Sequence, residues 1–452
     1  MRWSLTTGAR RARGPWAELW TWPTGGAVVG WLLAMGLVAL YPSMYSPRVR
    51  QLWPGDSDAA TAMLQVIAAA VITVTALTFT LTVVALQLAS QQFSPRLLRD
   101  FIRDRVTKAV LALLVGTFVY ALTVLRSLHR EEPLPELALL VAFGLGLASL
   151  ASVIAFISHI TRVLRVDTMM LTVHDETART IATFYPAYGD ERPQSPHGAG
   201  HGMDPDFGEP VIARRSGFLR YIHVDELVRA CERADAFVRV DVRAGDHIVQ
   251  GTPVASVWSL VHTRKPAPSV FEAVHDALNF DYERTVDQDA AFGFRQLEDI
   301  AVKALSPAIN DPVTATHAIG HMADLLVTLC GRKLGPTLHT DAAGRGRVVV
   351  PDRDLRYYLE LACGQVRRYG AAEPTVLKAL LAMLRDVAAA ARNDEHRTEI
   401  ERQVCYIIAE LPASIADHDA EQVHDMAERV RLVLVGQVRA GFVDRSGETR
   451  ST

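Results

Sequence analysis

Two histidines with the spacing of metal ligands lie in one apolar stretch late in the chain. His317 and His321 are four residues apart and Asp324 follows three residues later, so on a helix the three side chains would share one face. With a carboxylate from the preceding segment, Glu298 or Asp299, such a set could hold zinc. However, fifteen His in 452 residues allow one such pair by chance, and no Glu lies between the two as in HExxH. We therefore expect no metal site, and these three residues would be the ligands if one existed.

Hydroxyl and amide side chains recur along an uncharged segment at residues 60–89. Read as a helix, it carries two adjacent polar faces, one with Thr73, Thr80 and Gln87 and the other with Thr75, Thr78 and Thr82. Two interpretations remain open. The hydroxyls could bond to the carbonyl four residues earlier and pack between helices. Alternatively, the six side chains could line a water-filled path across a membrane.

The short motifs of common catalytic and nucleotide-binding sites do not occur in the sequence. It contains no GxxxxGK[ST], no GxGxxG after a strand, no GxSxG and no HExxH. The four cysteines, Cys231, Cys330, Cys363 and Cys405, are far apart, which argues against a zinc ribbon, a redox dithiol or a disulfide framework. No feature indicates an enzyme, and we expect no cofactor.

Four apolar stretches lie in the first 165 residues, and the second of them carries the two polar faces of threonine and glutamine. They run at about 25–41, 60–89, 110–125 and 137–160. A helix needs about 20 residues to cross ~30 Å of hydrocarbon, and Trp and Tyr residues typical of a membrane interface flank the first stretch. We predict a transmembrane domain of four helices at residues 25–165.

The distribution of Lys and Arg predicts the orientation. Residues 1–165 hold 15 Lys+Arg against 8 Asp+Glu, concentrated in segment 1–24, in the loop at 96–108 and just after the fourth stretch. The positive-inside rule then places both termini in the cytoplasm, with 1–24 as a basic cytoplasmic segment. The remainder of the chain is acidic overall, which argues against nucleic acid as a partner.

A short basic segment follows the second apolar stretch. Ser94 and Pro95 form a helix start, and the residues after them alternate so that one face is apolar and the other carries Arg96, Arg99 and Arg103. One interpretation is an amphipathic helix at the inner membrane surface, with its arginines near anionic headgroups. The other is a helix docked on the soluble part of the protein.

The second half of the sequence changes character twice. Residues 166–210 comprise a helical pattern followed by a Pro/Gly-rich linker. Residues 211–268 contain short β-rich runs between glycine turns, and this piece resembles half of a barrel-sandwich hybrid, the fold of biotinyl and lipoyl carriers. A carrier needs a lysine for its covalent group, but there is none between Arg214 and Trp258. The carrier role is therefore excluded, and a small β module remains.

From residue 269 onwards the pattern is helical. We predict a bundle of about six helices over 269–440, interrupted by a polar, glycine-rich break at 333–347, and a disordered tail at 441–452. Asp311 followed by Pro312 has the pattern of an N-cap and first helical residue. The predicted fold class is thus an α-helical membrane protein with four N-terminal transmembrane helices and a cytoplasmic α+β region, a barrel-sandwich-like β module followed by a helical bundle.

Several motifs together resemble a known family. They are VALQLASQQFSPRLLRDFIRD, GTFVYALTVLR, RSGF…RAGDHIVQGTPVA and FGFRQLEDIAVKALSPAINDP, and they occur in order between about residues 60 and 320. The sequence is similar to the bacterial membrane protein family called domain of unknown function 2254. The resemblance implies N-terminal transmembrane helices, a cytoplasmic region and a bacterial inner (plasma) membrane, but it implies no activity and no catalytic residues.

Three classes of function remain. A channel- or transporter-like protein would use the Thr/Gln faces as a path and the cytoplasmic region as a regulatory domain, and this is our first hypothesis. A membrane-anchored sensor or scaffold would bind a ligand or partner through the cytoplasmic region. An enzyme would need a catalytic cluster that the sequence does not reveal. The expected partners are the lipid bilayer and further copies of the chain, with the ligand unknown.

Overall fold

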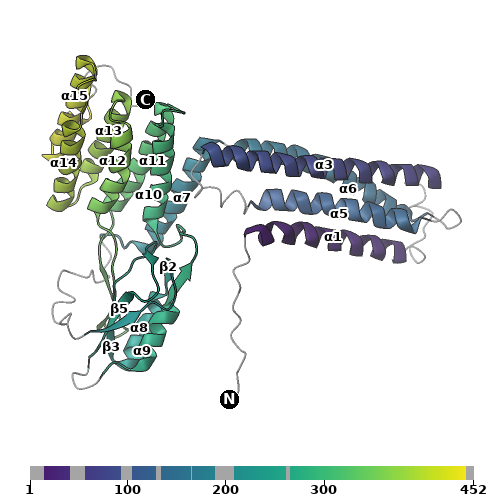
Figure 1. Cartoon of the computed structure of the whole chain (residues 1–452), viewed down its shortest axis with the longest axis horizontal. Helices are drawn as coiled ribbons and strands as arrows, with labels where there is room; N and C mark the ends of the chain where they lie inside the picture. Colours follow the sequence, from purple (N-terminus) through teal and green to yellow (C-terminus); the bar gives the residue numbers. More distant parts are fainter. Residues whose placement is uncertain are drawn as a thin grey trace. The chain divides into compact units, whose positions relative to one another are not determined.

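The chain forms two compact units, Met1–Thr168 and Met169–Thr452 (Figure 1). The structure is a computed structural model and describes residues 15–40, 56–92, 104–128, 134–163, 165–188, 208–260 and 265–443. It is mostly helical, with long apolar helices in the first unit and a mixed sheet region in the second. The predicted order, apolar membrane helices followed by an α+β region, is confirmed at this level.

Four long helices make up the described part of the first unit. They are α1 (Pro15–Leu40), α3 (Ser57–Gln92), α5 (Arg105–Ser127) and α6 (Glu136–Val163). Each contains one of the four apolar stretches found in the sequence, and each is long and apolar enough to cross a membrane. Helix α5 packs against the other three, and α3 also packs against α6. Large apolar side chains such as Trp31, Leu147 and Ile154 remain exposed on the outside, as a surface that contacts lipid requires.

Glycines bring the backbones of α1 and α5 into contact. A Cβ at Gly30 would lie 2.9 Å from the carbonyl carbon of Gly116, and a Cβ at Gly26 would lie 2.8 Å from that of Ala112. No other residue type allows this approach, because Gly alone has no Cβ. Gly26 and Gly30 are four residues apart, which is the small-xxx-small spacing of closely packed membrane helices.

Polar side chains inside the first unit bond to one another or to the backbone. The Tyr120 hydroxyl on α5 donates to the carbonyl of Ala138 on α6 at 2.9 Å, and the buried Ser149 and Thr117 hydroxyls are 3.1 Å apart. These bonds stabilise the packing of α5 against α6. Separating the two helices within an apolar interior would leave polar groups unsatisfied, at a cost of about 2–7 kcal/mol each.

The second unit begins within α7 (Val166–Phe184) and continues into a β-rich module. Its elements are β1 (Glu209–Ile212), β2 (Gly217–Ile222), α8 (Val224–Ala234), β3 (Ala236–Val240), β4 (His247–Ile248), β5 (Pro253–Ser259), α9 (Pro268–Ala277) and β6 (Leu278–Asp281). A three-stranded sheet has the order β4-β2-β6, and a five-stranded sheet has the order β1-β5-β3-β8-β7. One core of Val, Leu, Ile and Ala joins the sheets to α8 and α9, including Val238, Leu227 and Val274.

Two strands of the larger sheet come from a later part of the chain. β7 (Thr337–Thr340) and β8 (Gly346–Val350) form a hairpin between α11 and α12, and β8 pairs in parallel with β3. The helical bundle is interrupted at 333–347, where the sequence predicts a polar, glycine-rich break, but the two strands of this segment were not predicted. The polar, glycine-containing residues form the hairpin turn, and the apolar side chains of Val348 and Val349 are buried.

The sequence did not reveal helix α8 within the β module, because it lies in the region 211–268, for which we predicted only short strands. Helix α9 begins at the start of the region predicted as helical, whereas β6 is a strand within that region. Helix α8 alternates charged and apolar residues and buries only Leu227, Ala230 and Cys231, so its pattern is dominated by solvent-facing charge.

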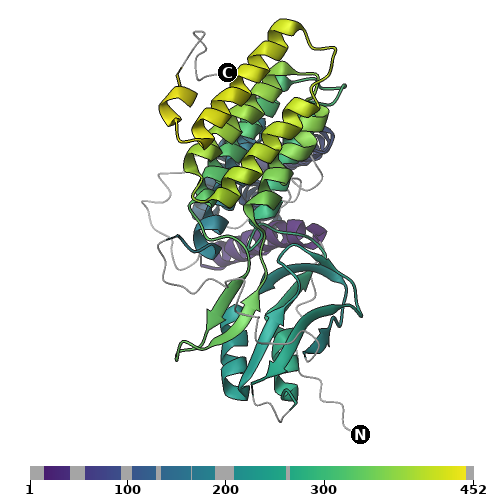
Figure 2. The same cartoon turned by 90° about the vertical axis from the view of Figure 1, so that its left-hand side faces the viewer.

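Helices following the β module pack side by side as a bundle (Figure 2). They are α10 (Ala290–Ala304), α11 (Pro312–Cys330), α12 (Leu355–Tyr369), α13 (Pro374–Ala390), α14 (Asp394–Ala409) and α15 (Asp417–Leu434), followed by the short α16 (Val438–Gly441). Helix α11 is also long and apolar enough to cross a membrane, which makes five such helices in the described residues. It packs against α10, α12 and α13 of the bundle.

The Phe-Gly-Phe motif at the start of α10 marks a close contact with α7. A Cβ at Gly293 would overlap the hydroxyl oxygen of Thr177 and lie 2.9 Å from its Cβ. Both residues are buried, and nearby the Thr180 hydroxyl donates to the carbonyl of Val286 at 2.9 Å. Phe294, next in the motif, packs its ring 5.2 Å from that of Tyr358 on α12. The glycine thus sets the distance between α7 and the bundle.

The N-cap predicted for α11 is present. Asp311 accepts hydrogen bonds from the Thr314 backbone N–H at 3.1 Å and from the Thr314 hydroxyl at 2.6 Å, with Pro312 in the first turn. These bonds lower the pKa of the Asp311 carboxyl. Its stabilising effect is therefore present above the pKa of the unfolded chain and is lost as the pH falls through the lowered pKa of the folded state.

Removing this cap should destabilise the second unit modestly. We expect Asp311→Ala to lower the free energy of unfolding by about 1 kcal/mol, and Asp311→Asn and Asp311→Ser to be nearly neutral because both retain an acceptor oxygen. Thermal unfolding of the detergent-solubilised full chain measures this. If all three variants abolished function with the fold intact, Asp311 would have a role beyond capping.

Candidate functional site

A buried arginine ties together three loops where the β module meets the helical bundle. Arg353, 5% exposed, lies between β8 and α12. Its guanidinium donates to the carbonyl of Ala244 at 3.1 Å and to the carboxylates of Asp289 at 3.3 Å and Asp246 at 3.5 Å. The segment after β3, the start of α10 and the start of α12 are thereby held at one point.

The charges around Arg353 are balanced within the protein. Burial lowers the pKa of Arg353, but the nearby negative charges, Asp289 first among them, outweigh this, so its pKa lies above the ordinary value. Asp289 is itself 1% exposed and also pairs with Arg284. A buried pair of this kind contributes to stability only when further hydrogen bonds satisfy both partners. Asp289 has such bonds, whereas the Nε of Arg353 has no hydrogen-bond partner within the described residues.

The neighbouring Asp352 connects the same segment to the end of α7. The hydroxyl of Tyr185, which directly follows α7, donates to Asp352 at 3.3 Å and lies 2.6 Å from the hydroxyl of Tyr358 on α12. Burial, with the Asp352 charge, raises the pKa values of both tyrosines well above the ordinary value. Burial also raises the pKa of the Asp352 carboxyl to about 6.

Two cavities share Asp352 and Arg353 among their lining residues. The first, which we call the arginine cavity, has a volume of about 630 Å³ and lies between α12, α14 and the segment after β3. The second, the α8 cavity, also has about 630 Å³ and is lined by α8, β7 and the residues that follow α7. Volumes of this size are typical of sites for small organic molecules.

The arginine cavity is lined by five arginines and four carboxylates. The arginines are Arg243, Arg353, Arg356, Arg367 and Arg402, and the carboxylates are Asp352, Asp354, Glu360 and Glu410. At the α14 end, Arg367 donates to Glu410 at 2.9 Å and its guanidinium lies 5.0 Å from the centre of the Tyr406 ring. At the other end, Arg353 lies 5.2 Å from the Tyr357 ring centre. The two tyrosines remain 37% and 39% exposed.

The histidines considered as metal ligands lie elsewhere, on α11. Asp324 pairs with His174 of α7, with Nε2 and Oδ2 separated by 2.8 Å, and His174 packs its ring 5.3 Å from that of His321. His174 could not be selected from the sequence, because it is 150 residues from Asp324. Among the described residues, no group of three or more His, Cys, Asp or Glu side chains has an arrangement that could hold a metal ion.

The threonines of α3 are all bonded to their own helix. The hydroxyls of Thr73, Thr75, Thr78, Thr80 and Thr82 each donate to the carbonyl four residues earlier, at 2.7–3.0 Å. Thr78 is buried, Thr75 and Thr82 are half-buried, and Thr73, Thr80 and Gln87 are exposed on the outside of a single copy. The two faces found in the sequence therefore differ in exposure.

Some predicted features lie outside the described residues. Arg96, Arg99 and Arg103 fall in 93–103, the Pro/Gly linker falls mainly in 189–207, and most of the tail falls in 444–452. The predictions for these segments stand as they were.

Sequence reasoning missed the Asp352–Arg353 site because its partners are far apart in the chain. Tyr185 and Tyr358 are separated by 173 residues, and Arg353 and Asp289 by 64. One local signal was available, since Pro351 to Asp354 places three charged residues between an apolar strand and a helix. Such a run is more often a solvated turn, and burial of Arg353 could not be read from it.

Apolar helices able to cross a membrane, combined with a second unit built of two sheets and a helical bundle, define an integral membrane protein with a large additional α+β region. Comparison with known families agrees. The chain belongs to the family described as "Predicted membrane protein (DUF2254)", whose model matches residues 16–386.

Two curated relatives are mycobacterial. The chain is similar to an uncharacterized protein of Mycobacterium bovis and to one of Mycobacterium tuberculosis, each 31% identical over 431 residues, covering 92% of this chain and 80% of the relative. No solved structure matches the chain.

Proposed function

We propose that this protein is a membrane-anchored sensor, in which the second unit binds a small ligand and passes its presence to the membrane helices through α7. One observation carries the proposal: both cavities are walled by Asp352 and Arg353, and Asp352 is hydrogen-bonded to Tyr185 at the end of α7. A ligand in either cavity would contact the segment that holds α7 in place.

Chain connectivity supports this route. Helix α6 ends at Val163 and α7 begins at Val166, so α7 directly follows the last helix of the first unit in the chain. On the other side, Thr177 of α7 is in close contact with Gly293. The middle of α7 is therefore held by this contact. A ligand could act on α7 at its C-terminal end, where Tyr185 is hydrogen-bonded to Asp352 of the cavity lining.

The proposal places the second unit in the cytoplasm, with four helices crossing the membrane. Helix α11 is the fifth candidate by length and composition, but it packs against three helices of the bundle, and this supports counting it as a bundle helix. The basic residues at 1–24, 96–108 and 162–165 favour the inside for both termini.

Reporter fusions test this topology. Fusions at residues 55, 131 and 452 should read outside, outside and inside, because the two loops expected outside carry fewer unbalanced basic residues. An outside reading at residue 452 would disprove the four-span arrangement.

The sensor proposal is tested by ligand-induced stabilisation. A ligand that binds only the folded state raises the unfolding midpoint, so the purified full chain in nanodiscs should be stabilised by at least one class of small metabolite. Asp352→Leu should weaken that effect, whereas Asp324→Asn on α11, outside both cavities, should not. Absence of stabilisation by every class would contradict the proposal.

A channel- or transporter-like function is the second candidate. It is favoured by the exposure of Thr73, Thr80 and Gln87 on one side of α3, where further copies of the chain could bring several such faces together around a path. The carbonyl bonds of the threonine hydroxyls weigh against it, since their protons are already used within the helix.

Flux measurements separate the two candidates. Thr73→Val and Thr80→Val are nearly isosteric and should keep the fold. If α3 lines a path, they should lower ion flux into liposomes without changing oligomer size, because each removes a polar group that replaces water around an ion. Wild-type liposomes with no flux above that of empty vesicles, for inorganic and small organic ions, would favour the sensor.

A further inference from the structure

The arginine cavity has a chemistry that selects its ligand. We propose that it binds a small organic phosphate, with the phosphate group held by Arg243, Arg353 and Arg356 and the organic part extending along α12 towards Tyr406. This rests on the proposed sensor function and adds the class of ligand to it.

The carboxylates that line the cavity are already engaged. Asp354 accepts the Tyr357 backbone N–H at the start of α12, and Glu410 accepts from Arg367. Glu360 accepts from the Gln403 side chain at 2.8 Å, and Asp352 accepts from the Arg353 backbone N–H at 2.7 Å and from Tyr185. None of the four is paired with Arg243 or Arg356.

The arginines at one end of the cavity keep donors available. Arg243 and Arg356 are exposed and have no ion pair among the residues that the structure describes. Arg353 is buried, and its Nε has no hydrogen-bond partner within the described chain. A buried N–H without a partner is costly. This Nε is closed to solvent in the structure, so a ligand oxygen would satisfy it after a small movement of the Arg353 side chain.

This set of donors fits a phosphate better than a carboxylate. Guanidinium groups bind oxyanions through paired N–H donors, and a phosphate monoester offers three terminal oxygens to the three arginines, whereas a carboxylate offers two. A phosphate alone would leave most of the cavity of about 630 Å³ unfilled. The remaining space runs past the exposed faces of Tyr357 and Tyr406, which suits an organic group.

Binding to the full chain in nanodiscs tests the proposal, with ribose 5-phosphate and adenosine 5′-monophosphate as probes. Adenosine, acetate and inorganic phosphate separate the contributions of the organic part, of a carboxylate and of the phosphate ion. We expect the two esters to bind, inorganic phosphate to bind more weakly, and adenosine and acetate not to bind. Equal binding of inorganic phosphate would overturn the organic part of the proposal.

Matched variants locate the site. Arg243→Gln and Arg356→Gln should each weaken ester binding about tenfold or more, because each removes charge-assisted hydrogen bonds. Both side chains are exposed, so the unfolding midpoint without ligand should not change. Arg368→Gln is the control, since Arg368 is exposed on the same helix but outside the cavity, and it should bind like the wild type.

The outcomes distinguish this proposal from the sensor function. Ester binding that is unaffected by Arg243→Gln and Arg356→Gln would overturn the assignment of the cavity. Stabilisation of the wild type by another class of compound, with no phosphate ester bound, would overturn the ligand class and leave the sensor. Stabilisation by no compound would overturn both.

Discussion

Gly293→Ala should destabilise the second unit strongly, although alanine is the better helix former. Helix propensity alone favours the substitution by about 1 kcal/mol. The new Cβ, however, would overlap the Thr177 hydroxyl and lie 2.9 and 3.0 Å from its two carbon atoms, and overpacking of this kind typically costs about 1–3 kcal/mol or more. We expect the steric cost to dominate and the unfolding midpoint of the full chain to fall.

Two further variants make this test decisive. Gly320→Ala, within α11 of the same bundle, adds a Cβ where no atom lies within 4 Å, so the propensity gain should appear there as a higher midpoint. Thr177→Ala combined with Gly293→Ala removes the overlapping hydroxyl oxygen and the methyl carbon and should recover part of the loss, while the Cβ of residue 177 at 2.9 Å remains. A Gly293→Ala midpoint equal to or above the wild type would contradict the close α7–α10 contact.

The second large effect is expected in the membrane helices, at Gly30. Gly30→Val places a branched side chain against the Gly116 backbone, where even a Cβ would be 2.9 Å from the carbonyl carbon. A backbone atom cannot rotate away as a side chain can, so α1 must separate from α5. We expect a loss of about 3 kcal/mol, the upper end of the usual overpacking range, seen as a lower unfolding midpoint in detergent.

Gly36→Val is the control on the same helix. No atom lies within 4 Å of a Cβ at Gly36, and an added valine there would face outwards. Similar losses for Gly30→Val and Gly36→Val would indicate a general effect of valine on α1 and would rule out the specific contact with α5.

Most of the helices could be predicted from the sequence because their signals are local. The four apolar stretches of the first unit appear as α1, α3, α5 and α6, and the Asp311–Pro312 start of α11 was read from cap chemistry alone. Helix α12 lies within the region predicted as a helical bundle, with Asp354 as its N-cap and Gly370 at its C-terminal end. In these segments, helix propensity, capping residues and apolar periodicity all indicate a helix.

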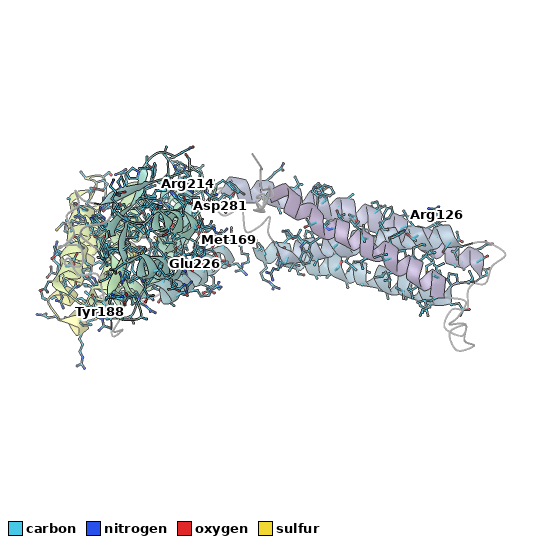
Figure 3. All side chains as sticks on the ribbon, turned by 90° about the horizontal axis from the view of Figure 1, so that it is seen from below. Arg126, Met169, Tyr188, Arg214, Glu226 and Asp281 are labelled. Atoms are coloured by element: carbon cyan, nitrogen blue, oxygen red, sulfur yellow. The ribbon has the colours of Figure 1, made fainter. Side chains whose placement is uncertain are left out.

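The remaining features depend on contacts between distant residues. β8 pairs with β3 across more than one hundred residues, and its two buried valines are too short a run to distinguish a strand from a loop. The pairing of Tyr185 with Tyr358 and of His174 with Asp324 could not be predicted either, because 173 and 150 residues separate the partners in the chain. Figure 3 labels Met169, within α7, and Tyr188, three residues after Tyr185.

The β7–β8 hairpin lies late in the chain, and this has a consequence for folding during synthesis on the ribosome. β3 lies in the middle of the five-stranded sheet, yet its neighbour β8 is translated only after α10 and α11. Until residue 350 has emerged, the nascent chain carries β3 with one side unpaired, and an unpaired strand edge is a template for aggregation. β8 is thus translated later than its partner strand β3, so the β module cannot be completed before two of the six bundle helices, α10 and α11, have been translated.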